Sequence, residues 1–287
     1  MLRVAGFIFF CLMFLDSCST QRMAAQMAFP LIQGQYIAMQ EEADIGLAAK
    51  AIPSNLKMME GLLKGDETST SILNHLAEGF CSYSFSFVED GEPERASALY
   101  QRGRDYAVRS LVESSSVGDL LALTGKEFQS ALKKTNVNDL PALFWMGQCW
   151  SGWLMLNLGS PETFADISRV EWLMKRTVEL DEAYHYAGPH LALGGFYGSR
   201  TKMLGGNPEQ ARLHFERGLE LNQRKFLLIQ LIYAKTYAVQ SQDKELFERL
   251  LKEILESHSN ALPEQRLANE VAKQKARNLL DMADELF

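Results

Sequence analysis

The sequence predicts an all-α fold built from helical hairpins that repeat along the chain. Three observations predict it. Apolar residues recur at helical spacing over most of the 287 residues, and one helix–turn–helix stretch at 190–223 is repeated earlier, at 75–103. Strand signals are weak by comparison, because the apolar–polar alternation at residues 83–87 is short and lies inside a predicted helix.

Residues 190–223 have the plan of a helix, a tight turn and a second helix. Gly205 and Gly206 end the first helix. Asn207 can cap the second with its side-chain oxygen, and Pro208 occupies a first-turn position whose N–H has no helical partner. The small residues Gly194, Ala211 and Gly218 stand where the two backbones approach, and the large residues Leu193, Tyr197 and Phe215 stand between them. This interlocking is typical of tetratricopeptide repeats.

The same pattern occurs in three other places. Residues 75–103 match residues 190–218 at one constant offset. A third copy, at 142–182, has a longer connection between its helices. A fourth, at 234–253, has the usual tetratricopeptide spacing, with Asp243 as the expected cap of its second helix.

Helices are also predicted outside the repeats. Residues 41–53 and 54–65 carry two apolar stripes at helical spacing, and residues 104–135 are helical without a repeat match. The charged amphipathic stretch 262–287 is expected to cap the array, because a terminal repeat needs a polar outer face. We therefore assign residues 41–287 to one tetratricopeptide-like helical-repeat solenoid with a C-terminal capping helix.

The first forty residues predict export and anchoring. A short basic start precedes the apolar run Val4–Leu15, which has the length of a signal peptide's apolar region. The stretch Leu15–Cys18, LDSC, resembles a bacterial lipoprotein lipobox, in which Cys18 would receive a diacylglyceryl group and become the mature N-terminus. We assign residues 1–17 to a signal peptide and 18–40 to a lipidated tether and linker. Plain cleavage, or an uncleaved anchor, is the alternative.

Signals for catalysis are few. The five histidines lack metal-ligand spacing, CxxC pairs are absent, and no nucleophile stands in a catalytic motif. A net charge of −7 gives no basic face for nucleic acid. Cys81 and Cys149 each follow a repeat glycine, and we expect two buried thiols rather than a disulfide. We therefore expect no enzyme, no cofactor, no metal and no nucleic-acid partner.

An aromatic and basic cluster is the candidate binding surface. Amphipathic rings and a guanidinium on a concave face suit an apolar acid or a peptide. The alternative is that the rings belong to the solenoid core and that the arginine lies on a solvated face. The candidate ligand-binding or partner-binding residues are Trp150, Tyr184, Tyr186, Tyr197 and Arg200.

Several stretches together resemble the T component that accompanies TRAP (tripartite ATP-independent periplasmic) transporters. The most specific lies at residues 188–222, GPHLALGGFYGSRTKMLGGNPEQARLHFERGLELN, and others are LAEGFCSYSFSFVED and FWMGQCWSGWL. The resemblance implies a periplasmic, usually lipid-anchored helical protein that binds the transporter's substrate-binding subunit. It also implies homo-oligomers such as trimers, and a pore or cleft that passes or holds a small hydrophobic ligand. It brings no catalytic residue. A periplasmic ligand carrier and a general interaction scaffold unrelated to TRAP transport are the alternatives.

We predict that Cys18 is the mature N-terminus and carries lipid. Mass spectrometry of protein extracted into detergent should give a chain that begins at Cys18 and carries added acyl groups. A Cys18→Ser variant, which has no thiol to acylate, should lose this modification and leave the detergent phase. A wild-type chain that still starts at Met1 with an unmodified Cys18 would contradict the prediction.

Overall fold

The computed structural model describes residues 2–115, 117–258 and 260–287, with the side chains of residues 2–19, 161 and 162 left aside. Over this part of the chain the structure is all-α, with thirteen α-helices and no strand, which confirms the predicted class. Among the described residues, no helix has both the length and the apolar character needed to cross a bilayer.

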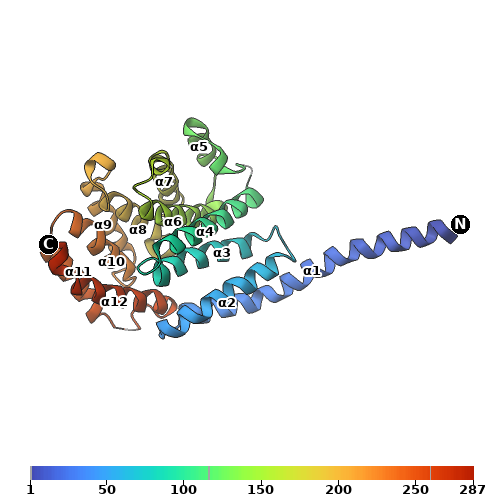
Figure 1. Cartoon of the computed structure of the whole chain (residues 1–287), viewed down its shortest axis with the longest axis horizontal. Coiled ribbons are helices and arrows are strands. Elements are labelled where there is room, and N and C mark those ends of the chain that lie inside the picture. Colours follow the sequence, from blue (N-terminus) through green and yellow to red (C-terminus); the bar gives the residue numbers. More distant parts are fainter. Residues whose placement is uncertain (1, 116, 259) are drawn as a thin grey trace.

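The helices pack in sequence order as stacked hairpins (Figure 1). Helix α3 pairs with α4, α6 with α7, α8 with α9, and α10 with α11. The bounds are α1 (Leu2–Gln40), α2 (Ile45–Leu63), α3 (Thr70–Tyr83), α4 (Pro93–Ser114), α5 (Gly125–Leu132), α6 (Leu140–Leu156), α7 (Pro161–Leu180), α8 (Tyr184–Gly198), α9 (Pro208–Leu221), α10 (Leu228–Tyr233), α11 (Lys244–Glu256), α12 (Arg266–Asp281) and α13 (Ala283–Leu286).

The predicted repeat register is present at the contact of α8 with α9. Ala211 is fully buried, and a Cβ atom at Gly194 would stand 2.8 Å from carbons of the Phe215 ring, so only glycine fits there. In the third copy Gly147 meets Met174 in the same way. The small residues therefore mark the points where helix backbones approach, as the sequence pattern indicates.

The first copy packs differently from the others. Gly79 faces Leu56 of α2 rather than a residue of its own hairpin. Tyr100, which aligns with Phe215, packs against Gly152 of α6. Helix α3 is therefore held by α2 on one side as well as by α4 and α6.

The N-terminal caps of α9 and α11 are as expected, but two other expected boundaries are wrong. Helix α8 ends at Gly198, before the expected Gly205 and Gly206, and Gly205 instead ends a short 3₁₀ turn at Lys202–Leu204. The Asn207 side chain accepts a hydrogen bond from the Gln210 N–H, and Asp243 caps α11 in the same manner. The two helices expected at 41–53 and 54–65 form one helix, α2, which contains Pro53. The missing proline N–H removes a helical hydrogen bond, but apolar side chains on both sides of Pro53 are buried against neighbouring helices and hold α2 together.

Cys81 of α3 and Cys149 of α6 form a disulfide, with their Cα atoms 5.3 Å apart. This corrects the expectation of two separate thiols. The two cysteines occupy equivalent positions in different repeats. Because α3 packs on α6, these two positions lie opposite each other at the helix contact. A bond that closes a loop of 68 residues stabilises a fold by about 2–4 kcal/mol.

Residues 20–40 form the packed end of α1, where the sequence composition predicts a linker. Ala25 and Ile32 are buried against the domain. Near the same end, Arg22 and Gln26 both reach Asp66, at 3.3 Å in each case. A composition rich in Ala, Met and Gln favours helix formation, so the segment needs only a surface to pack on.

Helix α12 covers the end of the array and also closes it. It packs on α10 and α11 at one side and on α1 and α2 at the other. Figure 1 shows it running from α11 back toward α2. Leu267 and Val271 of α12 are buried with Ala48 of α2. Buried Lys275 places its Nζ 2.5 Å from the Asp90 carboxylate. The solenoid is thus joined end to end.

We predict that Ala211→Leu destabilises the fold by about 1–3 kcal/mol, because the added carbons have no space between α8 and α9. Urea unfolding followed by circular dichroism measures the change. Arg212→Leu adds a similar side chain at an exposed position of the same helix and should change the free energy of unfolding by about 0.5 kcal/mol or less. Equal midpoints for wild type and Ala211→Leu would contradict the register.

Candidate functional site: a central cavity

A cavity of about 530 Å³ lies among the helices of the array and is open to solvent on one side. Its wall is built from residues of α1, α2, α3, α4, α6, α8, α10 and α12. Helices from both ends of the chain meet around it because α12 closes on α1 and α2. The volume is that of a typical small-molecule site.

Most of the wall is apolar. Representative lining residues are Ile32, Leu56, Leu154, Phe196, Phe226 and Val271. All six are themselves largely buried, so the cavity is preformed by the packing of the core. An apolar cavity of this kind gives water few hydrogen-bond partners, and an apolar ligand gains free energy by filling it.

Two π-helical turns border the cavity. One, Ser84–Val88, continues α3, and the other, Ala234–Ala238, continues α10. Phe85 of the first and Lys235 of the second both line the wall. A π turn adds one residue to a helical turn and re-aims the side chains around it, and such turns are frequent at functional sites. Both segments have apolar residues at helical spacing, which predicts a helix but does not reveal the extra residue.

Glu78 of α3 is an acidic side chain on this wall. The Tyr36 hydroxyl donates a hydrogen bond of 2.6 Å to its Oε1 atom, and the Gln40 amide donates to the same atom at 3.2 Å. Burial raises the pKa of Glu78 to about 7, although the bond from Tyr36 favours the ionised form. Near neutral pH the side chain therefore exists in both protonation states. Both donors come from α1.

His185 lines the wall at the start of α8. Its φ angle of 45° begins three consecutive left-handed residues that end at Ala187. Left-handed backbone is costly away from glycine and persists only where packing holds it. The ring packs edge-on against Trp145, with centroids 5.0 Å apart. Burial lowers the pKa of His185 to about 4, so it is neutral at physiological pH.

The candidate residues from the sequence lie outside this cavity wall. Trp150 is buried and donates its indole N–H to Asp166 Oδ2 at 3.0 Å. Tyr197 is buried and its hydroxyl donates to Glu171 Oε1 at 2.8 Å. These placements favour the core packing that was weighed against binding, and a contact with a ligand or partner stays a prediction for both residues.

Arg200 also lies in the interior, so the expectation that it belongs to a solvated face is wrong. Its guanidinium stacks on the Phe196 ring, 3.6 Å from the centroid, and its Nε donates to the Phe196 carbonyl at 3.0 Å. Tyr184 and Tyr186 are half-buried and flank His185 in an aromatic cluster. Their role in binding likewise stays a prediction.

Cys18 lies within α1, but its side chain is among those outside the described part of the structure.

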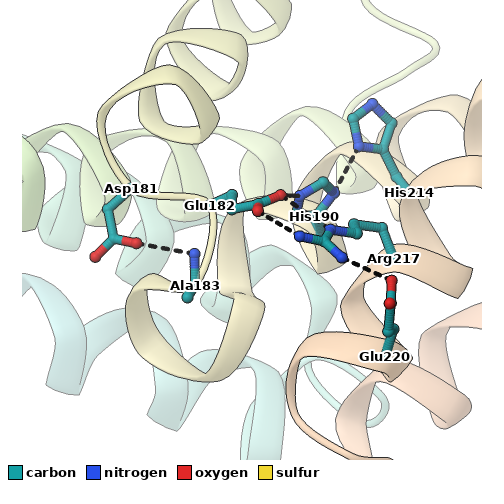
Figure 2. Close-up of polar contacts among 7 residues, drawn as sticks. All are labelled: Asp181, Glu182, Ala183, His190, His214, Arg217 and Glu220. Carbon is teal, nitrogen blue, oxygen red and sulfur yellow. Dashed lines mark hydrogen bonds and ion pairs between the residues drawn. The ribbon is translucent and has the colours of Figure 1, made fainter.

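A second polar cluster joins α8 to α9 (Figure 2). Glu182 accepts two hydrogen bonds from Arg217 and contacts His190 Nε2 at 3.1 Å. Nδ1 of His190 lies 2.9 Å from Nδ1 of His214, so one ring donates and the other accepts. Burial lowers the pKa of both rings, to about 4 for His214. The cluster fastens a hairpin, whereas His75, at the matching repeat position, borders the cavity.

An all-α repeat array with an apolar cavity among its helices defines a helical-repeat protein. The model of one family, described as the TRAP transporter T-component, matches residues 41–287. The chain belongs to the TRAP transporter T-component family, as the resemblance of its repeats indicated. The matched range coincides with the predicted domain and leaves α1 outside. No curated protein matches the sequence.

We predict that Glu78 makes the fold less stable as pH rises. Its pKa is raised from 4.5 to about 7 on folding, so between these values the folded chain binds more protons than the unfolded chain. The free energy of unfolding of wild type should therefore fall, relative to that of Glu78→Gln, as pH rises from about 4.5 to about 7. Urea unfolding of both proteins across this range measures the difference. The buried histidines contribute equally to both proteins, so parallel pH profiles would contradict the assignment.

Proposed function

We propose that this protein is a periplasmic, lipid-anchored accessory component of a TRAP transport system. In this role it binds the substrate-binding subunit and holds a small hydrophobic ligand in its central cavity. One observation carries the proposal: the chain belongs to the T-component family, and its helices surround an apolar cavity of about 530 Å³. The proposed activity is binding, without catalysis, cofactor or metal.

Two observations support the proposed compartment. The apolar run Val4–Leu15 followed by LDSC has the form of an exported lipoprotein's start. The disulfide between Cys81 and Cys149 is of a kind that persists in oxidising compartments such as the periplasm. Anchoring through Cys18 would attach the membrane to the end of α1.

The partner proposal rests on the family and on surface available for contact. TRAP systems include a substrate-binding subunit, and an accessory protein acts only where it meets the other components. Exposed apolar side chains such as Met27 and Leu31 on α1 and Met203 between α8 and α9 are available for such contacts. Homo-oligomers, such as the trimer implied by the family resemblance, belong to the same proposal.

A ligand carrier unrelated to TRAP transport is the second candidate. The cavity favours it, because holding an apolar ligand requires no partner protein. A carrier is stabilised by its ligand according to RT ln(1 + [L]/Kd), so thermal-shift screening with small apolar compounds separates it from a pure interaction scaffold.

We predict a complex with a TRAP-type substrate-binding protein from the same cell. The chain from residue 19 onward, which keeps the packed part of α1, is mixed with the purified partner at roughly tens of micromolar, about ten times a weak Kd of a few micromolar. Sedimentation velocity should give a faster boundary than either protein alone. An unrelated periplasmic binding protein of similar mass is the control. Independent sedimentation of the two proteins would remove the partner proposal and leave the ligand carrier.

A further inference from the structure

The cavity wall carries an acidic group without a cationic partner among the described residues. Tyr36 and Gln40 both donate to Oε1 of Glu78, and Oε2 receives no hydrogen bond from the described part of the protein. Lys235 is a cation on the wall, but its Nζ lies 3.3 Å from Glu89 Oε1. One oxygen of a part-buried carboxyl group is thus left for a ligand.

The charges on the wall indicate which ligand would fit. Glu78, Glu89 and Asp90 all line the cavity. Lys235 pairs with Glu89 and Lys275 pairs with Asp90, so among the described residues Glu78 is the wall carboxyl group left without a cation. A carboxylate ligand would add a like charge to a poorly solvated space, whereas an ammonium group would supply the missing countercharge. An ammonium group also offers three hydrogen-bond donors and no acceptor, which matches the free oxygen of Glu78.

We propose that the cavity selects an apolar primary amine, with its hydrocarbon chain on the apolar wall and its ammonium group hydrogen-bonded to Oε2 of Glu78. This proposal rests on the proposed ligand-holding function of the cavity. It goes beyond the family match, because Tyr36 and Gln40, which occupy the other oxygen, lie before the matched residues 41–287.

The electrostatic surroundings of Glu78 support an ion pair that forms only with the ligand. Tyr36 of α1 and Tyr184 and Tyr186 of α8 are the titratable groups that face it from other helices, and burial raises the pKa of all three, so they stay neutral. His75 lies on the same helix as Glu78, and its ring packs against the Tyr36 ring with the two centroids 5.0 Å apart. Burial raises the pKa of Glu78 itself to about 7. Amine binding should therefore strengthen as pH rises through 7 and Glu78 ionises.

The test uses isothermal titration calorimetry on the mature chain, residues 18–287, with Cys18→Ser so that no detergent competes for the cavity. The probes are decylamine, decanol and decanoate, which share one chain length. At pH 7.5 decylamine should bind about ten-fold more tightly than decanol, and decanoate should bind most weakly, because a hydrogen bond to a charged group exceeds a neutral one by about this factor.

Two variants with the same charge change separate the head-group site from the rest of the wall. Glu78→Gln should weaken decylamine binding about ten-fold and leave decanol within about three-fold. Glu89→Gln, also on the wall but paired with Lys235, should keep the preference for decylamine. Equal binding of decylamine and decanoate, or decylamine binding unchanged in Glu78→Gln, would overturn the proposal while leaving a hydrophobic-ligand function in place. Absence of binding by all three probes would overturn the ligand-holding function with it.

Tyr36→Phe gives a second measurement that does not depend on the folding of Glu78→Gln. The Tyr36 hydrogen bond favours ionised Glu78, so its loss should shift the pH midpoint of decylamine binding upward. An unchanged midpoint in a folded Tyr36→Phe protein would mean that the amine does not meet Glu78, and the proposal would fall.

Discussion

The seam where α12 meets α1 and α2 is the constraint on which the rest of the structure depends. Leu267 and Val271 bury their side chains with Ala48 there, and Lys275 places its ammonium group over the Phe85 ring and beside Asp90. Without this seam the hairpins would form an open solenoid, and the present cavity would be a solvent-filled groove. The enclosure of Glu78, and hence its raised pKa, follows from the closure.

An apolar cavity lowers the stability of a fold, because the wall atoms lack contacts on one side. His185, the first of three consecutive left-handed residues, and Glu78, a carboxyl group with a free oxygen, stand on the same wall. Strained backbone and unpaired polar groups lower stability, and proteins retain them mainly at sites where a ligand or a motion compensates for the lost free energy. The disulfide between Cys81 and Cys149 ties α3 to α6 beside this region and offsets part of the cost.

Local signals in the sequence were enough to predict the hairpins, because caps and close backbone approaches need particular residues. Asn207, Asp243 and Gly194 all occupy the positions expected of them. The cavity could not be predicted in this way, because residues near 36, 78 and 267 form its wall together. Contacts between residues so far apart in the sequence leave no short motif. The same reason explains the missed disulfide. Trp150, expected to belong to a binding surface, lies in the core because α7 covers its face of α6 and supplies Asp166 as its hydrogen-bond partner.

Helix α1 links the proposed anchor to the cavity. A flexible tether would let the domain take any height above a membrane, whereas a helix rises 1.5 Å per residue and fixes the distance between its ends. Residues 18 and 36 lie about 27 Å apart along such a helix. If Cys18 carries lipid, Tyr36 and Glu78 then lie at a set distance from the acyl chains, with α1 packed on the domain through Ala25 and Ile32. The segment that sequence composition marks as a spacer therefore forms part of the cavity wall, so a change in its length or rotation would alter the cavity as well as the proposed anchor.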